Sequence, residues 1–271
     1  MKVTLLGTGT SAGIPVLTCR CAVCQSEDFR DKRLRCAALV EWSDAVLAID
    51  AGPDFRQQLL RAAPRTLDAV VFTHEHKDHV AGLDDIRPFN FLQGKKISVY
   101  ATERVEAALR REYHYIFSGE DYPGIPEIEL HLIDDKPFQV AGHLIIPIKA
   151  MHHKLPVLGF RIGNFAYITD ANRIEEEEFQ KLRDLDVLIL NALRRTPHIS
   201  HFSLDEAIAL AQRIGARYTF FTHISHQMGL HAEVESQLSP GMGLAYDGLS
   251  FVWGEDGSLQ INHRTKGWPP E

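Results

Sequence analysis

Residues 73–79, with the sequence Thr-His-Glu-His-Lys-Asp-His, are the feature that most constrains this chain. Residues 68–72, Asp-Ala-Val-Val-Phe, come just before them and are typical of a buried strand. Three histidines and an aspartate within six residues of such a strand are hard to explain by packing. Imidazole and carboxylate are ligands that suit Zn, Mn, Fe or Ni. The segment therefore predicts a metal site, with His74 and His76 facing one ion and Asp78 and His79 facing a second.

The spacing His-x-His-x-Asp-His resembles the signature of the metallo-β-lactamase superfamily. Other segments follow in that family's order, namely residues 7–13, 49–52, Thr169-Asp170 and Thr222-His223. The resemblance extends over residues 1–253. It is closest to the branch of phosphoribosyl cyclic phosphodiesterases of phosphonate breakdown, because that branch shares the pattern Cys-x-Cys-x-x-Cys at Cys19 and the segment Thr-His-Ile-Ser-His-Gln at residues 222–227.

Strand-like and helix-like segments alternate along the chain, which argues for an α/β fold. We expect strands at 3–6, 38–42, 46–49, 69–72, 97–100, 144–148, 165–168, 187–190, 218–221 and 249–253, and helices near 53–61, 103–112, 175–183 and 204–214. The resemblance implies the four-layer αββα sandwich of the metallo-β-lactamase type. No low-complexity linker divides the chain, so we expect one domain over residues 1–271. Residues 113–140, rich in aromatic residues and proline, are expected to form an active-site wall or an interface.

The resemblance also implies the remaining ligands of a metal pair. The third histidine of the first ion is expected shortly before a glycine that opens a strand, which favours His153, with His152 as the alternative. Asp170 matches the carboxylate that bridges the two ions, and His223 matches the last ligand of the second ion. Asp50 is expected to support the ligating histidines without binding metal itself.

Cys19, Cys21 and Cys24 form a compact cluster of thiols in a segment with little other structural signal. Three thiolates and one nitrogen make a closed, tetrahedral zinc site of the structural type. In the phosphodiesterase branch that this chain resembles, the fourth ligand corresponds to His226. Cys36 is the alternative, which would give a site of four thiolates. We therefore predict one structural zinc.

A further histidine, His201, lies just before the helix expected at 204–214. In the family, a histidine at that place contacts the scissile phosphate and acts as general acid, so the resemblance gives this role to His201, with His198 as the weaker choice. Ser203 and Glu206 have the spacing of a capping box, which supports a helix start there. Arg194 and Arg195 could bind a phosphate or remain solvated.

This set of residues predicts hydrolysis of a phosphodiester. Two divalent ions, Zn or Mn, about 3.5–4 Å apart can hold a bridging hydroxide and clamp a phosphoryl oxygen. Asp78 is placed to orient the nucleophile or take its proton, and His201 to protonate the leaving alkoxide. We expect a dinuclear phosphodiesterase that acts on a small cyclic or nucleotide-like phosphodiester.

Three other functions could use the same ligands. A tRNA 3′-processing endonuclease would need a protruding basic arm, and the sequence has no long Gly- and Lys-rich insertion. A thioester or lactone hydrolase would not need His201 or the cysteine cluster. A non-catalytic accessory protein, resembling that of pyrroloquinoline quinone biosynthesis, shares the cysteine cluster. Degraded metal ligands would indicate that last outcome, yet every ligand position is filled.

Composition favours a small-molecule substrate over a polyanionic partner. The chain has 29 basic and 36 acidic residues among 271, so its formal net charge is −7. Nucleic acids and anionic membranes bind proteins through excess positive charge, so we expect neither partner. Metal ions would supply the local positive charge that a phosphate substrate needs. A homodimer is left open.

The expected location is the cytoplasm. Residues 1–7 lack the apolar core and cleavage site of a signal peptide. No apolar run approaches the ~18 residues that a membrane span needs. Three of the four cysteines lie within six residues, which fits a metal clip in a reducing compartment better than disulfides.

Overall fold

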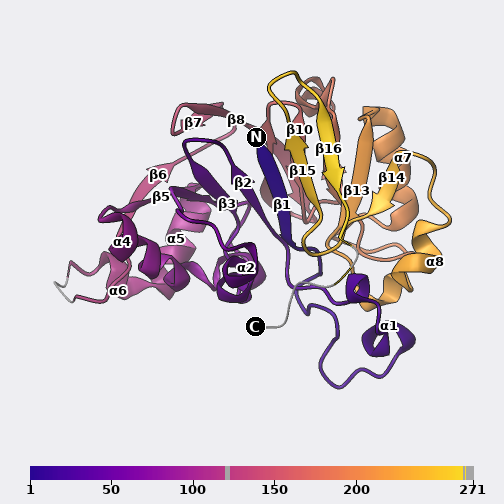
Figure 1. Cartoon of the computed structure of the whole chain (residues 1–271), viewed down its shortest axis with the longest axis horizontal. Helices are drawn as coiled ribbons and strands as arrows, with labels where there is room; N and C mark the ends of the chain where they lie inside the picture. The colour runs from indigo at the N-terminus through magenta and orange to yellow at the C-terminus, as the bar shows by residue number, and fades with distance from the viewer. Residues whose placement is uncertain (120–122, 265, 267–271) are drawn as a thin grey trace.

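The computed structural model describes residues 1–119, 123–264 and 266, and its strands form two sheets packed face to face (Figure 1). In order across the first sheet lie β16 (Leu259–Asn262), β15 (Ser250–Trp253), β1 (Lys2–Gly7), β2 (Ala37–Glu41), β3 (Val46–Ile49), β4 (Ala69–Val71), β5 (Ile97–Ala101) and β6 (Ile128–Leu132). Across the second lie β11 (Arg173–Ile174), β8 (His143–His152), β9 (Leu155–Ile162), β10 (Phe165–Ile168), β12 (Val187–Asn191), β13 (Tyr218–Thr222) and β14 (Met242–Leu244), with β7 (Phe138–Val140) paired to β8.

Helices cover the outer faces of both sheets, with α2, α4, α5 and α6 beside the first sheet and α7 and α8 beside the second (Figure 1). The α-helices are α1 (Ala22–Gln25), α2 (Phe55–Ala62), α3 (Lys77–Val80), α4 (Arg87–Gln93), α5 (Glu103–Glu112), α6 (His114–Phe117), α7 (Leu204–Ile214) and α8 (His231–Glu235). Short 3₁₀ helices are η1 (Phe29–Asp31), η2 (Leu83–Ile86), η3 (Glu176–Leu182) and η4 (His226–Met228). The four-layer αββα sandwich implied by the sequence is confirmed.

Three hydrophobic clusters separate the four layers. In β3, Leu47 and Ile49 point into the core between the sheets, while Ala48 packs toward the helices outside the first sheet. In β12, alternate side chains likewise divide between the central core and the layer under α7. Strands that are buried on both faces have continuous apolar sequences. For this reason these strands could be predicted from the sequence.

The central strands of each sheet run parallel, and this determines where the site can form. β3, β4, β5 and β6 pair in parallel in the first sheet, and β10, β12, β13 and β14 do so in the second. Parallel strands place all their carboxyl ends at one edge of a sheet, where α/β proteins bind ligands. The two edges meet across the sandwich, and the residues singled out in the sequence follow these strand ends.

Helices α5 and α7 have the bounds predicted from the sequence, and the capping box of Ser203 and Glu206 at α7 is confirmed. The helix expected at 175–183 is instead the 3₁₀ helix η3. Four consecutive glutamates at 175–178 repel one another there. In addition, the carboxylate of Glu178 is held by the backbone N–H of Lys149 and by Lys181.

The stretch 113–140 has more regular structure than a connection. It contains α6, the edge strand β6 and the short strand β7; residues 120–122 lie outside the described part. Over the residues that the structure describes, no helix is long and apolar enough to cross a membrane. The core between the sheets draws on residues from Val3 to Phe251, and on this basis we propose a single domain.

Candidate metal centre

Several site residues directly follow strands of both sheets. Asp50 follows β3, Asp170 comes two residues after β10, and His223 follows β13. These three residues have positive φ angles of 65°, 55° and 57°. Non-glycine residues rarely adopt this left-handed conformation, and it concentrates at functional sites. The chain reversal at each strand end brings these side chains together between the two sheets.

Helix α3, which carries Asp78 and His79, is drawn close to the loop after β3. The backbone N–H of Ala51 donates to the carbonyl of His79 at 2.8 Å. A Cβ atom on Gly52 would lie 2.0 Å from the carbonyl oxygen of Asp78. Only glycine allows this approach, so Gly52 helps to place both side chains beside Asp170.

Four side chains surround one position suited to a cation. Nε2 of His79 lies 3.3 Å from Oδ2 of Asp78 and 3.2 Å from Oδ2 of Asp170. Nδ1 of His223 lies 3.0 Å from the same Asp170 oxygen. Atoms that bind one ion at about 2.0–2.2 Å lie about 3.0–3.5 Å from one another. The spacing of these atoms therefore fits a shared metal ion.

Histidine rings from two segments, the loop before α3 and the end of β8, surround a second position. The ring centroids of His74 and His76 are 4.6 Å apart, and those of His76 and His152 are 5.1 Å apart. Nε2 of His74 lies 4.0 Å from Oδ1 of Asp170, the oxygen turned away from His79. The carboxylate of Asp170 thus faces each position with a different oxygen.

Buried ring nitrogens without partners support metal binding at both positions. Nε2 of His74, Nε2 of His79 and Nδ1 of His201 are buried and have no hydrogen-bond partner among the described residues. Buried polar atoms are nearly always hydrogen-bonded, and an exception needs a reason. A cation would satisfy both Nε2 atoms, so the residues present fit bound divalent metals.

The structure corrects the choice of His153 over His152. His153 is the first residue of the two-residue turn that joins β8 to β9, has a φ of 57°, and is exposed. His152 is the last residue of β8, and its ring contacts those of His76 and His201. Neighbouring residues of a strand point to opposite faces, so a shift of one position exchanges the solvent-facing and site-facing histidines. His152 replaces His153 in the ligand set that we propose.

Asp50 orients histidines on both sides of the site. Nδ1 of His79 lies 2.7 Å from Oδ2 of Asp50. The hydroxyl of Thr73 donates to the same carboxylate at 2.9 Å and lies 3.0 Å from Nδ1 of His74. Both rings therefore carry their proton on Nδ1 and turn a free Nε2 toward the site, the arrangement typical of metal-binding histidines. This agrees with the supporting role expected for Asp50.

Two further orienting groups were not foreseen. The hydroxyl of Thr10 lies 3.1 Å from Nε2 of His223, and the carbonyl of Ser200 lies 2.8 Å from Nδ1 of His152. Thr10 lies in the glycine-rich turn after β1, 213 residues from its partner. Nothing in the sequence indicates either contact.

The electrostatics of the metal-free site show strong coupling between acids and histidines. Burial opposes charge on Asp170, yet the charges of His223 and His79 hold the pKa of its carboxyl well below its usual range. Burial likewise opposes protonation of His223, but the charge of Asp170 raises its pKa to about 10. The charged ring of His223 thus carries a proton on Nδ1, the nitrogen that faces Asp170, and metal binding there should displace it.

His201 lies inside the cluster rather than at its rim. Its ring stacks on His223 with centroids 4.7 Å apart, and its Nδ1 lies 3.9 Å from Oδ1 of Asp170. Burial and the charge of His223 lower the pKa of His201 to about 3. Arg194 and Arg195 are held by side-chain amides and backbone carbonyls of neighbouring loops, which gives them a structural role.

The cysteine cluster forms a second candidate site, and its His226 lies three residues after His223 of the first. The Sγ atoms of Cys19, Cys21 and Cys24 lie 3.2, 3.5 and 3.7 Å from Nδ1 of His226. These separations fit four ligands around one zinc, since Zn–S is about 2.3 Å and Zn–N about 2.0–2.1 Å. The alternative Cys36 is buried elsewhere, 3.5 Å from the hydroxyl of Thr222. His226 is therefore the fourth member of the cluster.

Comparisons with known proteins converge on one family. A model of the Beta-lactamase superfamily domain matches residues 46–224. The solved structure of a diphosphatase from the PhnP family is 38% identical, with a TM-score of 0.87, and the match covers 93% of this chain and 98% of that one.

Two curated relatives carry other names. Coenzyme PQQ synthesis protein B of Methylorubrum populi is 32% identical over 229 residues, which are 70% of this chain and 72% of that protein. An octanoyltransferase of Porphyromonas gingivalis is 42% identical over 261 residues, 95% of this chain. This chain spans only about half, 52%, of the length of that relative.

Proposed function

The chain belongs to the Beta-lactamase superfamily domain family, and we propose that it is a metal-dependent hydrolase that cleaves a small phosphodiester. The observation that carries the proposal is the placement of Asp170, with one carboxylate oxygen toward His74 and the other toward His79 and His223. A carboxylate between two sets of imidazoles can bridge two cations. Adjacent cations suit a phosphoryl group because they neutralise charge on its oxygens.

The fold implies divalent metals, and we propose two in this site and one structural zinc. The residues that would hold the first ion are His74, His76 and His152, and those for the second are Asp78, His79 and His223, with Asp170 shared between them. Zn or Mn fits these nitrogen and oxygen ligands. Bound there, the ions would lower the pKa of water and polarise the phosphoryl oxygens.

The side chains of the protein would orient the groups that react. Asp78 is half-buried beside His79, where its carboxylate can align the attacking water or accept its proton. His201 is neutral at neutral pH because its pKa lies near 3. A neutral imidazole still carries one N–H, so we propose that His201 directs this N–H at the leaving oxygen.

The resemblance to a diphosphatase favours a second candidate bond. That protein is 38% identical over nearly the whole chain, so a diphosphate linkage is an alternative to the ester. Both linkages present the same phosphoryl oxygens to the metals, but phosphate leaves more readily than an alkoxide. The octanoyltransferase relative is about twice as long, and this chain spans 52% of it. We therefore do not propose acyl transfer for this chain.

Hydrolysis assays with the metal-loaded protein test the proposal. The panel comprises bis-p-nitrophenyl phosphate, a 2′,3′-cyclic nucleotide, a dinucleoside diphosphate, a thioester and a lactone, each with Zn or Mn. We expect the phosphorus esters to be cleaved and the thioester and lactone to be poor substrates. Preferential cleavage of the thioester or lactone would contradict the proposal. A metal-loaded protein that cleaves none of them would favour the accessory role to which the 32% identity with the PQQ synthesis protein points.

A further inference from the structure

The two candidate metal sites are connected by one short stretch of chain. His223 is a proposed ligand of the second catalytic ion, and His226 is the fourth member of the cysteine cluster. Only Ile224 and Ser225 separate them in the sequence. Each histidine faces a different site, so the position of one restricts the position of the other.

The two residues between the histidines are held on both sides. The backbone N–H of Ile224 donates to the carbonyl of Thr8 at 2.9 Å, and the backbone N–H of Thr10 donates to the carbonyl of Ile224 at 3.1 Å. On the other side, the backbone N–H of Ser225 donates to the carbonyl of Leu193 at 2.9 Å. Both Ile224 and Ser225 are buried. Close-packed interiors transmit displacements rather than absorb them, so a shift at one histidine reaches the other.

The segment from Thr10 to Cys24 contacts this stretch at both of its ends. At one end, the hydroxyl of Thr10 lies 3.1 Å from Nε2 of His223. At the other end, the three thiols of the cysteine cluster lie 3.2, 3.5 and 3.7 Å from Nδ1 of His226. Cys24 and Ile224 also belong to the same buried hydrophobic cluster. The two segments are thus joined twice, once in each candidate metal site.

Thiols alone hold the joint at His226 weakly. Sulfur is a weak hydrogen-bond donor and acceptor, so the cysteines restrain this ring only loosely when they share no metal. Bonds from three thiolates and one ring nitrogen to a zinc ion have defined lengths and a tetrahedral arrangement. Zinc would therefore fix Nδ1 of His226 relative to the segment that carries Thr10.

We infer that the cysteine cluster positions His223 through His226 and Thr10, so that zinc held by the cluster strengthens binding of the second catalytic ion. This coupling rests on the metal content given with the proposed function, and it adds a dependence of one site on the other. Coupling between two binding sites is reciprocal, so the second ion should strengthen zinc binding by the same factor. The first ion should be unaffected, because its own histidines come from the loop before α3 and from the end of β8.

Binding of Mn²⁺ tests the coupling without a measurement of activity. Thiolates select zinc, whereas carboxylates suit Mn²⁺, so the protein can be loaded with Mn²⁺ at the strand ends, with or without one zinc in the cysteine cluster. Electron paramagnetic resonance measures free Mn²⁺ and thus the affinity of the bound ions, and circular dichroism reports folding. Removal of zinc should weaken binding of one Mn²⁺ ion by about 10–100-fold, the usual effect of losing a group that orients a ligand. One equivalent of zinc should restore the affinity.

Two variants identify the ion that responds. His76→Ala removes a proposed ligand of the first ion, so the ion that remains should still depend on zinc. His223→Ala removes a ligand of the second ion, so the ion that remains should bind equally well with and without zinc. Equal dependence in both variants, no dependence in the parent, or a parent that holds no zinc in the cluster would overturn the coupling. None of these outcomes involves hydrolysis, so a failure of the proposed function would appear separately, in the substrate panel.

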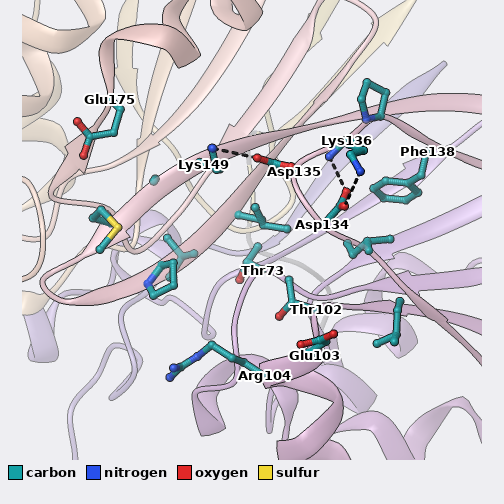
Figure 2. Close-up of a pocket in the computed structure, with 18 residues that line it drawn as sticks. Thr73, Thr102, Glu103, Arg104, Asp134, Asp135, Lys136, Phe138, Lys149 and Glu175 are labelled. Atoms are coloured by element: carbon teal, nitrogen blue, oxygen red, sulfur yellow. Dashed lines mark hydrogen bonds and ion pairs between the residues drawn. The ribbon is translucent and has the colours of Figure 1, made fainter.

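Phe138→Ala controls for a general loss of stability. Its ring lines the cavity of about 920 Å³ drawn in Figure 2 and stacks on Tyr100 with centroids 5.1 Å apart. None of the described residues that line this cavity is a proposed metal ligand. The variant should lose thermal stability through lost packing and keep the parental affinity for both Mn²⁺ ions. Weakening of Mn²⁺ binding as large as that after zinc removal would show that affinity follows stability, and would overturn the coupling.

His226→Cys covers the case in which removal of zinc unfolds the chain. Four thiolates also make a closed zinc site, so this variant should keep its zinc, which elemental analysis can verify. The cysteine side chain is shorter than that of histidine, so the backbone at position 226 has to move toward the zinc. Binding of the ion at His223 should then weaken by about tenfold or more. Parental Mn²⁺ affinity in a variant that has kept its zinc would overturn the coupling.

Discussion

The two candidate metal sites differ in how they are built and in what they leave open. The cysteine cluster brings four potential ligand atoms from a loop, α1 and η4 around one point, and no place remains for a substrate. The centre at the strand ends gathers side chains from both sheets, and one of them, His76, is exposed to solvent. Closed sites are typical of structural zinc, whereas catalytic sites keep a position open. We therefore expect a metal in the cysteine cluster to stabilise the fold, and metals at the strand ends to take part in catalysis.

The rigidity of the two sites also has different sources. At the strand ends, hydrogen bonds from the histidine rings to Asp50, Thr73 and Thr10 fix the orientation of those rings before any metal binds. In the cysteine cluster, the backbone N–H of Val16 lies 3.4 Å from Sγ of Cys24. The loop there has little regular structure apart from α1. We therefore expect the first site to survive loss of its metals and the loop to depend on its zinc.

The largest expected effect is on activity after loss of a ligand at the strand ends. His74→Ala or Asp170→Ala should abolish hydrolysis of an activated phosphodiester while the chain stays folded. Loss of a group that merely supports a ligand costs about 10–100-fold, so loss of a ligand should exceed about 10³-fold. Steady-state kinetics after removal and replacement of metals, with circular dichroism for folding, provide the measurement. Activity within tenfold of the parent would contradict a dinuclear site.

A matched pair on one hairpin sharpens the same prediction. His152→Ala should lose activity to a similar extent, because its ring lies among the other site histidines. His153→Ala should remain within about twofold of the parent, because an exposed turn residue makes few contacts. A large loss in His153→Ala with little loss in His152→Ala would instead indicate that His153 is the ligand.

Much of this centre could be predicted from the sequence because it follows strands. Asp170 and His223 each come after an apolar run, and polar residues at such places are conspicuous. The choice between His152 and His153 failed because it depends on a single step of hairpin register. The role of Thr10 could not be foreseen, because its partner is 213 residues away. Local patterns and the family resemblance thus indicated which side chains gather here, whereas their orientation depends on contacts distant in sequence.

The fold shows the same division. Strands such as β3 and β10, buried on both faces, were placed to the residue. The edge strand β6 was missed, because its side chains are half-exposed or exposed and prolines lie nearby in the sequence. Edge elements are stabilised mainly by pairing with a neighbour, which a single segment does not reveal.

The next largest effect should be a loss of thermal stability when a cysteine of the cluster is replaced. Cys21→Ser should lose a zinc that the parent keeps after mild chelation has removed the catalytic metals, and its thermal midpoint should fall, because structural zinc contributes directly to folding. Elemental analysis and thermal unfolding are the measurements. Cys36→Ser is the matched control and should keep this zinc, because Cys36 lies at Thr222 instead. A stable and fully metallated Cys21→Ser would remove the distinction between the two sites.

A smaller loss of activity is expected for a substitution of His201. This residue lies in the centre at the strand ends, and its Nδ1 has no hydrogen-bond partner among the described residues. His201→Ala should keep both catalytic metals and lower turnover of an ester with a poor leaving group by about 10²–10⁴-fold, the usual range for general acid catalysis. The loss should shrink for p-nitrophenolate, which departs without a proton. Equal losses on both esters would indicate a role in binding. Loss of a metal would make His201 a ligand, as its distance of 3.9 Å between Nδ1 and Asp170 Oδ1 allows.

The smallest effect should come from Thr10, which touches the site only through His223. If its hydroxyl accepts the Nε2 proton of that ring, as the 3.1 Å separation indicates, Thr10→Val should weaken binding of one metal by about 10–100-fold. Thr10→Ser retains the hydroxyl and should remain near the parent. Chelator competition gives the affinity of each ion, and excess metal should restore the activity of Thr10→Val. Equal losses in both variants would mean that Thr10 acts by packing. Activity that excess metal does not restore would mean that the turn after β1 positions the substrate as well as His223. The substrate-binding site would then include residues that follow β1, in addition to the residues that bind metal.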